Sequence, residues 1–186
     1  MNEPFPELLT VWRFIRRYFV RIVIGAVLVA MVYGALLVWV PYQREQRIIK
    51  EIEAYGGGAH WEYFGPDWIP QSMRDRTTLF SRVTDVGLGM QGNDANLEHL
   101  NGLTNLSWLN IQGTQVTDAG LEQLKELSNL KHLDLNDNIH VTDAGLEHLK
   151  GLTNLVYLDL NDTQVTAEGR AMLRKALPDC QIEPDP

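Results

Sequence analysis

The second half of the chain repeats itself three times at a nearly constant spacing. Segments that begin at Leu103, Leu127 and Leu152 align with one another, so the periods are 24 and 25 residues. Fixed periods of this length are typical of solenoids, in which each unit buries its apolar face against the next unit. The single extra residue falls between Asp137 and Val141, where an insertion is expected to lie in a loop. The repeat therefore limits the fold to a stack of small, similar units.

Each unit predicts a strand, a polar turn and a short helix. The unit opens with the pattern L-x-x-L-x-L, and the alternation at its end is typical of a strand with one apolar and one polar face. A threonine then lies where it can cap a helix. In the first two regular units the next residue is an aspartate, whose charge the helix dipole favours, and two leucines at helical spacing follow. In the first unit these positions are Leu106, Leu109, Ile111, Thr117, Asp118, Leu121 and Leu124.

This unit resembles the leucine-rich-repeat family. Its V-T-D-A-G-L ending, at Val116 and again at Val141, is similar to the variant found in F-box-type substrate adaptors and in many bacterial membrane-anchored repeat proteins. The resemblance covers roughly residues 81 to 182, because a degenerate first unit precedes the three regular ones. It implies an α/β fold, a short leucine-rich-repeat solenoid of parallel strands and short helices, whose outward strand face forms a shared concave surface.

The turn of the repeat departs from the family pattern. Where the family has Asn or Cys, this chain has Thr114, Asn138 and Thr163, so a buried amide is expected at most once. In the degenerate unit Val83, Val86 and Leu88 take the places of the strand leucines. Atypical end units are expected in solenoids, because they cover an exposed core.

The outward positions of successive strands are expected to stack into columns that bind a partner. The columns join aromatic, acidic and amide side chains, which suit a protein or peptide with apolar and basic groups. A solvated sheet face needed only for solubility is the alternative interpretation. The three columns are Trp108, His132 and Tyr157; Asn110, Asp134 and Asp159; and Gln112, Asn136 and Asn161.

Residues 22–40 predict a transmembrane helix that precedes the solenoid. This stretch of nineteen residues has no charged side chain, and a helix of that length reaches about 28 Å, close to the hydrocarbon thickness of a bilayer. Pro41 is expected to end the helix. A cleaved secretion signal is the alternative, although Val38, Trp39 and Val40 make a poor cleavage site. Four arginines before the span favour a cytoplasmic N-terminus and an extracytoplasmic repeat domain.

The sequence therefore predicts four regions. Residues 1–21 form a basic segment, 22–40 the membrane span, 41–80 a juxtamembrane stretch with an aromatic N-terminal cap, and 81–186 the repeat domain with a C-terminal cap. We expect the cap to be built from Trp61, Tyr63, Phe64 and Trp68, because large rings close a repeat core effectively.

Charge and motifs argue against several classes of function. The first 21 residues carry a net charge of +2, so the remainder of this chain of net charge −8 carries −10, which repels nucleic acids. The pattern G-x-G-x-x-G at Gly87, Gly89 and Gly92 lacks the strand and helix context of a dinucleotide site. A calcium site at Asp134 and Asp159 has no ligand loop to support it. No nucleophile, base and orienting group assemble in the pattern, so we expect neither catalysis nor a cofactor.

The sequence leaves three functions open. The first is a membrane-anchored module that binds a protein or an envelope component through the concave face. The second is a structural scaffold of the envelope with no dedicated ligand. The third is an F-box-like substrate-recognition adaptor, which the resemblance alone implies and which the span at 22–40, in place of an F-box segment, disfavours.

Overall fold

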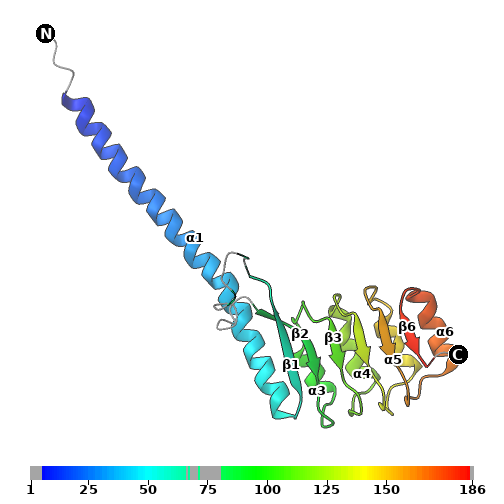
Figure 1. Cartoon of the computed structure of the whole chain (residues 1–186). Helices are drawn as coiled ribbons and strands as arrows, with labels where there is room; N and C mark the ends of the chain where they lie inside the picture. The colour runs from blue at the N-terminus through cyan, green and yellow to red at the C-terminus, as the bar shows by residue number, and fades with distance from the viewer. Residues whose placement is uncertain (1–5, 66, 68–70, 72–80, 185–186) are drawn as a thin grey trace. The chain divides into compact units, whose positions relative to one another are not determined.

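The computed structural model describes residues 6–65, 67, 71 and 81–184 (Figure 1). Within the long first helix, the side chains of residues 6–17, 20, 22, 35–39 and 41–42 are not described. The chain divides into two compact units, Met1–Pro41 and Tyr42–Pro186. The repeats and the sheet belong to the second unit.

Helix α1, Pro6–Ala54, is longer than the sequence predicted, because it continues beyond Pro41. The reason lies after the proline. Ile48, Ile49 and Ile52 recur at helical spacing and are all buried, and this packing offsets the roughly 3 kcal/mol that a proline costs inside a helix. Among the described residues, no helix combines the length and the apolarity that crossing a membrane requires.

The end of α1 is a glycine-based cap. Gly56 has a φ of 76°, a conformation that glycine adopts without a steric penalty. The N–H of Gly56 donates to the carbonyl of Glu53, and the N–H of Gly57 donates to the carbonyl of Ile52. This pair of hydrogen bonds satisfies the last carbonyls of the helix and turns the chain into the first strand.

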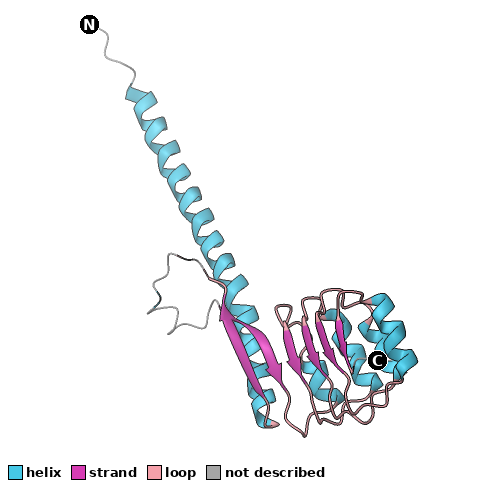
Figure 2. Cartoon of the chain, turned by 45° about the vertical axis from the view of Figure 1, so that its right-hand side comes forward, coloured by secondary structure: helices cyan, strands magenta, loops and turns pink. Residues whose placement is uncertain are grey.

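The sheet has six strands in the order in which they occur in the chain. The first two, β1 and β2, are antiparallel, and every later strand is parallel to the one before it. Figure 2 shows the strands side by side, with the short helices of the repeats on one face of the sheet. The strands are β1 Gly58–Tyr63, β2 Ser81–Gly87, β3 Trp108–Asn110, β4 His132–Asp134, β5 Tyr157–Asp159 and β6 Gln181–Glu183.

The predicted order of strand, turn and helix is present in each unit. Val86 pairs with Leu109, which places the degenerate unit in register with the regular ones as the sequence predicted. The repeated leucines form one core, and most of them have no exposed surface. The helical elements of the solenoid are α3 Asp94–His99, α4 Asp118–Leu121, η1 Glu122–Glu126, α5 Asp143–Leu149 and α6 Ala167–Ala176.

A ladder of aspartates joins each helix start to the next. Thr142 caps α5 by accepting a hydrogen bond from the N–H of Ala144. The same threonine donates its N–H and its Oγ1 hydroxyl to the carboxylate of Asp118 in the preceding unit, at 2.8 and 2.7 Å. Asp94 and Asp143 receive the equivalent pair of bonds from the threonines that follow them. The T-D dipeptide of the motif therefore forms hydrogen bonds between units as well as within one.

The glycine of the motif makes room for this aspartate. A Cβ placed on Gly120, Gly145 or Gly169 would overlap the carboxylate of the aspartate one unit earlier. At the two ends of the ladder the sequence departs from the motif. The first unit has Asn96 at the glycine position, where it closes a capping box, and the last unit has Ala167 at the aspartate position.

A helix covers the N-terminal end of the solenoid core, in place of the aromatic residues that the sequence predicted. Ile48, Ile49 and Ile52 of α1 belong to the core, whereas Trp61 and Phe64 are 43% and 58% exposed. Tyr63 is partly buried, and Trp68 lies outside the described residues. The physical reason is that one face of an amphipathic helix covers more of an open core than rings on an edge strand can.

Polar contacts fix this helix on the solenoid. The buried carboxylate of Glu45 accepts a hydrogen bond from the N–H of Val83 at 3.2 Å and lies 3.7 Å from the guanidinium of Arg82. Burial raises the pKa of Glu45, while the Val83 bond and the charge of Arg82 act in the opposite direction. Arg44 donates to the carbonyl of Asn101 at 2.7 Å. These bonds set the position of the helix along the first unit.

The C-terminal cap contains the single cysteine. Strand β6 follows α6 as the last short strand, as expected, and Leu177, Cys180 and Ile182 are buried there. Arg174 donates to the carbonyls of Ile182 and Pro184 and so holds the end of the chain. Burial raises the pKa of the Cys180 thiol to about 11.

The raised pKa predicts an unreactive thiol in the folded protein. Alkylation proceeds through the thiolate, so iodoacetamide at pH 8 should modify native Cys180 about two orders of magnitude more slowly than an ordinary cysteine. Mass spectrometry of the intact chain measures this rate directly, because the chain has one cysteine. Unfolding the protein in guanidinium should restore an ordinary rate. Equal rates in the native and unfolded protein would contradict the prediction.

Candidate functional site

The outward side chains of the strands form the first two of the three columns that the sequence predicted. Trp108 pairs with His132, and His132 pairs with Tyr157. Between these positions and the next outward ones lie Leu109, Leu133 and Leu158, which are fully buried. Because side chains alternate along a strand, the buried leucines force their neighbours onto the opposite face. The register extends the first column to His60 and Asp85 at one end and to Gln181 at the other.

The aromatic members of the first column differ in exposure. Trp108 is 51% exposed, which is unusual for so large an apolar ring. The rings of His132 and Tyr157 lie with their centroids 6.4 Å apart at an angle of 36°. Tyr157 is partly buried and donates its hydroxyl to Asp159 at 3.4 Å. Trp108 is therefore the member of this column that offers the most apolar surface to a partner.

The second column is acidic and continues beyond the residues that the sequence predicted. Asn110, Asp134 and Asp159 pair in sequence, and Asp159 pairs with Glu183 of β6. Asn110 donates from Nδ2 to Asp134 at 3.2 Å. Burial raises the pKa of Asp134, and the charge of Asp159 raises it further, while the bond from the Asn136 N–H lowers it. Neighbouring carboxylates on this column therefore repel one another, and a cation placed over them would relieve that repulsion.

The second column also has a role in the fold. Asn110 Oδ1 accepts from the N–H of Gln112, and Asp134 Oδ1 accepts from the N–H of Asn136. Asp159 accepts from the N–H of Asn161 in the same way. Each side chain thus stabilises the turn after its own strand. This use fits the alternative interpretation, in which the sheet face serves only the structure.

The third column lies in these turns and not on the strands. Gln112 is exposed, whereas Asn136 and Asn161 are partly buried. Asn161 donates to Asp159 at 2.7 Å, and the side-chain oxygen of Asn136 is buried without a hydrogen-bond partner among the described residues. Of the three predicted columns, this one has the least freedom to meet a partner.

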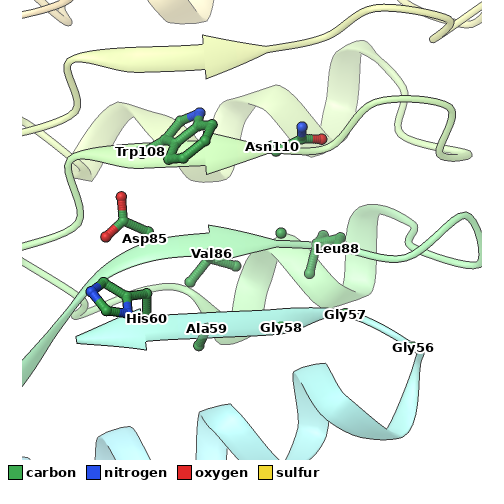
Figure 3. A pocket seen from close by; sticks show the side chains of 11 residues that line it. Gly56, Gly57, Gly58, Ala59, His60, Asp85, Val86, Leu88, Trp108 and Asn110 are labelled. Carbon is green, nitrogen blue, oxygen red and sulfur yellow. The ribbon is translucent and has the colours of Figure 1, made fainter.

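A pocket opens at the first end of the concave face (Figure 3). It has a volume of about 490 Å³ and lies over β1, β2 and β3. Gly58 and Gly87 pair with each other at the positions where the later strands carry the acidic column. Glycines at these positions leave the backbone uncovered, so the column of side chains is replaced by a hollow. Trp108 and Asn110 line it from β3, and Asp85 lines it from β2.

The pocket was not predicted from the sequence, although two of the residues that line it could have been found. The alignment of Val86 with Leu109 already places Asp85 and Gly87 in the first and second columns, so those two residues could have been found. His60 and Gly58 could not, because β1 runs antiparallel and has no counterpart in the repeat.

The glycines at 89 and 92 have packing roles. A Cβ on Gly89 would overlap the backbone of Tyr55 and Gly56, and a Cβ on Gly92 would lie 3.1 Å from the side chain of Thr114. Gly87 of the same pattern lies in β2. The G-x-G-x-x-G spacing thus arises from close packing at the start of the solenoid, with no helix directly after β2 in this described stretch.

Comparison with known proteins agrees with this architecture. Residues 104–165 match the family described as Leucine rich repeat. The match and the stacked units support a leucine-rich-repeat family. Among solved structures, an internalin from Listeria monocytogenes is 25% identical, with a TM-score of 0.35, over 46% of this chain and 30% of that one. A leucine-rich-repeat protein from Leptospira interrogans is 20% identical, with a TM-score of 0.34, over 46% and 27%.

This chain therefore spans less than a third of the length of either of those two structures. No match was found among curated proteins. Across residues 6–65, 67, 71 and 81–184, no group of three or more histidine, cysteine or acidic side chains is arranged to hold a metal ion.

Proposed function

We propose that this chain is a membrane-anchored leucine-rich-repeat protein that binds a protein or peptide partner through its concave strand face. The observation that supports it best is the register of the columns, which places exposed Trp108 next to Asp85 and on the same face as the row of carboxylates Asp134, Asp159 and Glu183. Aromatic anchors near charged groups are the usual carriers of binding energy at protein interfaces. Neither a catalytic group nor a cofactor is part of this proposal.

The anchor is proposed from residues 22–40. Apolar side chains along this part of α1 are exposed, with Val29 at 69% and Met31 at 65%. Water disfavours so much apolar surface, whereas a bilayer accommodates it. The nineteen uncharged residues match the thickness of a bilayer, and the arginines before them favour a cytoplasmic N-terminus. In this proposal the repeat domain lies outside the cytoplasm.

A pull-down with the full chain in detergent micelles tests the binding face. One bait has the natural sequence, and a second carries Trp108→Ala, Asp134→Ala, Tyr157→Ala and Asp159→Ala. We expect proteins identified by mass spectrometry to be retained by the first bait and reduced by about tenfold or more on the second, because anchor residues commonly account for over 1 kcal/mol each. Circular dichroism checks that both baits are folded.

A third bait serves as the matched control. It carries Met172→Ala, Glu126→Ala and Glu168→Ala, which remove exposed apolar and acidic side chains from the helical elements. This bait should behave as the natural chain does. If all three baits retain the same proteins, the concave face is not the binding site. That result would favour the scaffold function, in which the second column serves only the turns.

A further inference from the structure

The pocket at the first end of the concave face has a chemistry that selects its ligand. Gly58 and Gly87 form its floor, and a Cβ on either residue would meet no atom within 4 Å. The hollow is therefore open space above backbone rather than a cleft closed by side chains. An open floor of this kind admits a flat group that lies on the sheet. The side chains beside the floor determine which kind of group binds.

One wall is the indole of Trp108. Its 51% exposure leaves an aromatic face free for stacking, and Asp85 is its direct neighbour in the register. In Figure 3 both side chains project from adjacent strands at the His60 end of the pocket, and the labelled glycines lie toward its other end. A planar cation that stacks on an aromatic face and also meets a carboxylate is the guanidinium of arginine.

Asp85 has the capacity to receive such a cation. Its carboxylate accepts a hydrogen bond from Thr84 Oγ1 at 2.6 Å, and this bond uses only Oδ2. Among the described residues, no lysine or arginine lies within 4.0 Å of it. A second hollow of about 360 Å³ shares Asp85 and Trp108 and is also lined by Lys131 and His132. Lys131 is the one lysine or arginine among the described residues that line these two hollows, and His60 adds a polar wall to the first.

The strand face beyond the pocket is negatively charged, as Asp85 is. Asp134, Asp159 and Glu183 continue the second column from Asn110, so the face bears more carboxylates than Lys131 balances. A chain that crosses the strands from the pocket passes over these carboxylates. Charge complementarity therefore favours a basic segment over an acidic or a purely apolar one.

We propose that the pocket binds the guanidinium of an arginine carried by an extended basic peptide segment of another protein, which continues across the acidic column. This inference rests on the proposed function and names the chemistry of the partner. The guanidinium lies over Gly58 and Gly87, stacks on Trp108 and donates to Asp85. A lysine ammonium fits less well, because it cannot stack as a plane or donate two parallel bonds.

Calorimetric titration of the full chain in detergent micelles tests the pocket. The probes are acetyl-Gly-Ser-Arg-Ser-Gly-amide and the same peptide with citrulline or lysine in place of arginine. Citrulline keeps the shape and loses the charge, so we expect its Kd to be at least about tenfold higher than that of the arginine peptide, with lysine in between.

Two variants and one control locate the binding. Asp85→Asn removes the charge, and Gly87→Val fills the floor with a residue that suits a strand and whose Cβ meets no atom within 4 Å. Each should raise the Kd of the arginine peptide about tenfold. Glu126→Gln removes one exposed carboxylate from η1 and should leave the Kd unchanged.

Several results would overturn the proposal. These are equal binding of the arginine and citrulline peptides, absence of binding by the arginine peptide, or an unchanged Kd in both variants. The same Gly87→Val chain used as bait separates this proposal from the wider one. A partner that survives Gly87→Val but is lost with the four alanine substitutions would refute the pocket and leave the binding face standing.

Discussion

Replacing Gly145 with alanine should destabilise the repeat domain by about 3 kcal/mol. The added Cβ would overlap the carboxylate of Asp118 and would lie 2.8 Å from the side chain of Leu121. Asp118 cannot move aside without losing the two bonds that it accepts from Thr142. Alanine is favoured over glycine in a helix by up to about 1 kcal/mol, which is smaller than this loss. Urea unfolding of the full chain in detergent, followed by circular dichroism, measures the change.

Gly151→Ala is the matched control for this prediction. A Cβ at position 151 meets no atom within 4 Å, so the change in unfolding free energy should stay within about 0.5 kcal/mol. The cause can be tested as well. In a chain that already carries Asp118→Ala, the Gly145→Ala substitution should cost clearly less, because the carboxylate that the Cβ overlaps has gone and only the contact with Leu121 remains. Equal costs in both backgrounds would show that the ladder does not set the requirement for glycine.

The ladder also illustrates what a repeat reveals before the structure is known. Thr117 as a helix cap and Asp118 in the first helical turn were predicted from local rules, and both positions are as expected. The bond from Thr142 to Asp118 spans 24 residues and exists only when units stack. Local rules cannot show it, although the glycine that recurs at one position of the three regular units, Gly120, Gly145 and Gly169, indicates a close approach.

The two ends of the solenoid were harder to predict than its middle. The leucine period predicted the register of Trp108, His132 and Tyr157, because every regular strand repeats the same pattern. No such repetition exists before residue 81. There, the aromatic cluster was expected to cover the core, and the helix containing Ile48 and Ile52 covers it instead. The pocket depends on an antiparallel strand from that non-repeating region, so it was missed with the cap.

Replacing Asn138 with alanine should cost about 3 kcal/mol of unfolding free energy. This amide has no exposed surface and is the one buried asparagine in the turns of the three regular units, as the sequence predicted. Its two N–H hydrogens serve the carbonyls of Ile111, Leu135 and Asn136, at 2.8, 2.9 and 3.3 Å. Its oxygen lies 2.7 Å from the hydroxyl of Thr114. Alanine removes all of these bonds from a buried turn, so the carbonyls of Ile111, Leu135 and Asn136 keep one partner each, and it opens a cavity.

Two further variants separate the buried network from the loss of any amide. Asn154 is exposed and donates to the carbonyl of Ser128 at 2.8 Å, so Asn154→Ala removes a similar bond at the surface and should cost about 1 kcal/mol or less. Asn138→Thr should recover part of the loss, because Thr163 at the equivalent position donates its hydroxyl to the carbonyl of Leu160. If Asn138→Ala and Asn154→Ala cost the same, burial adds nothing to the value of this amide, and the leucine core alone holds the turn.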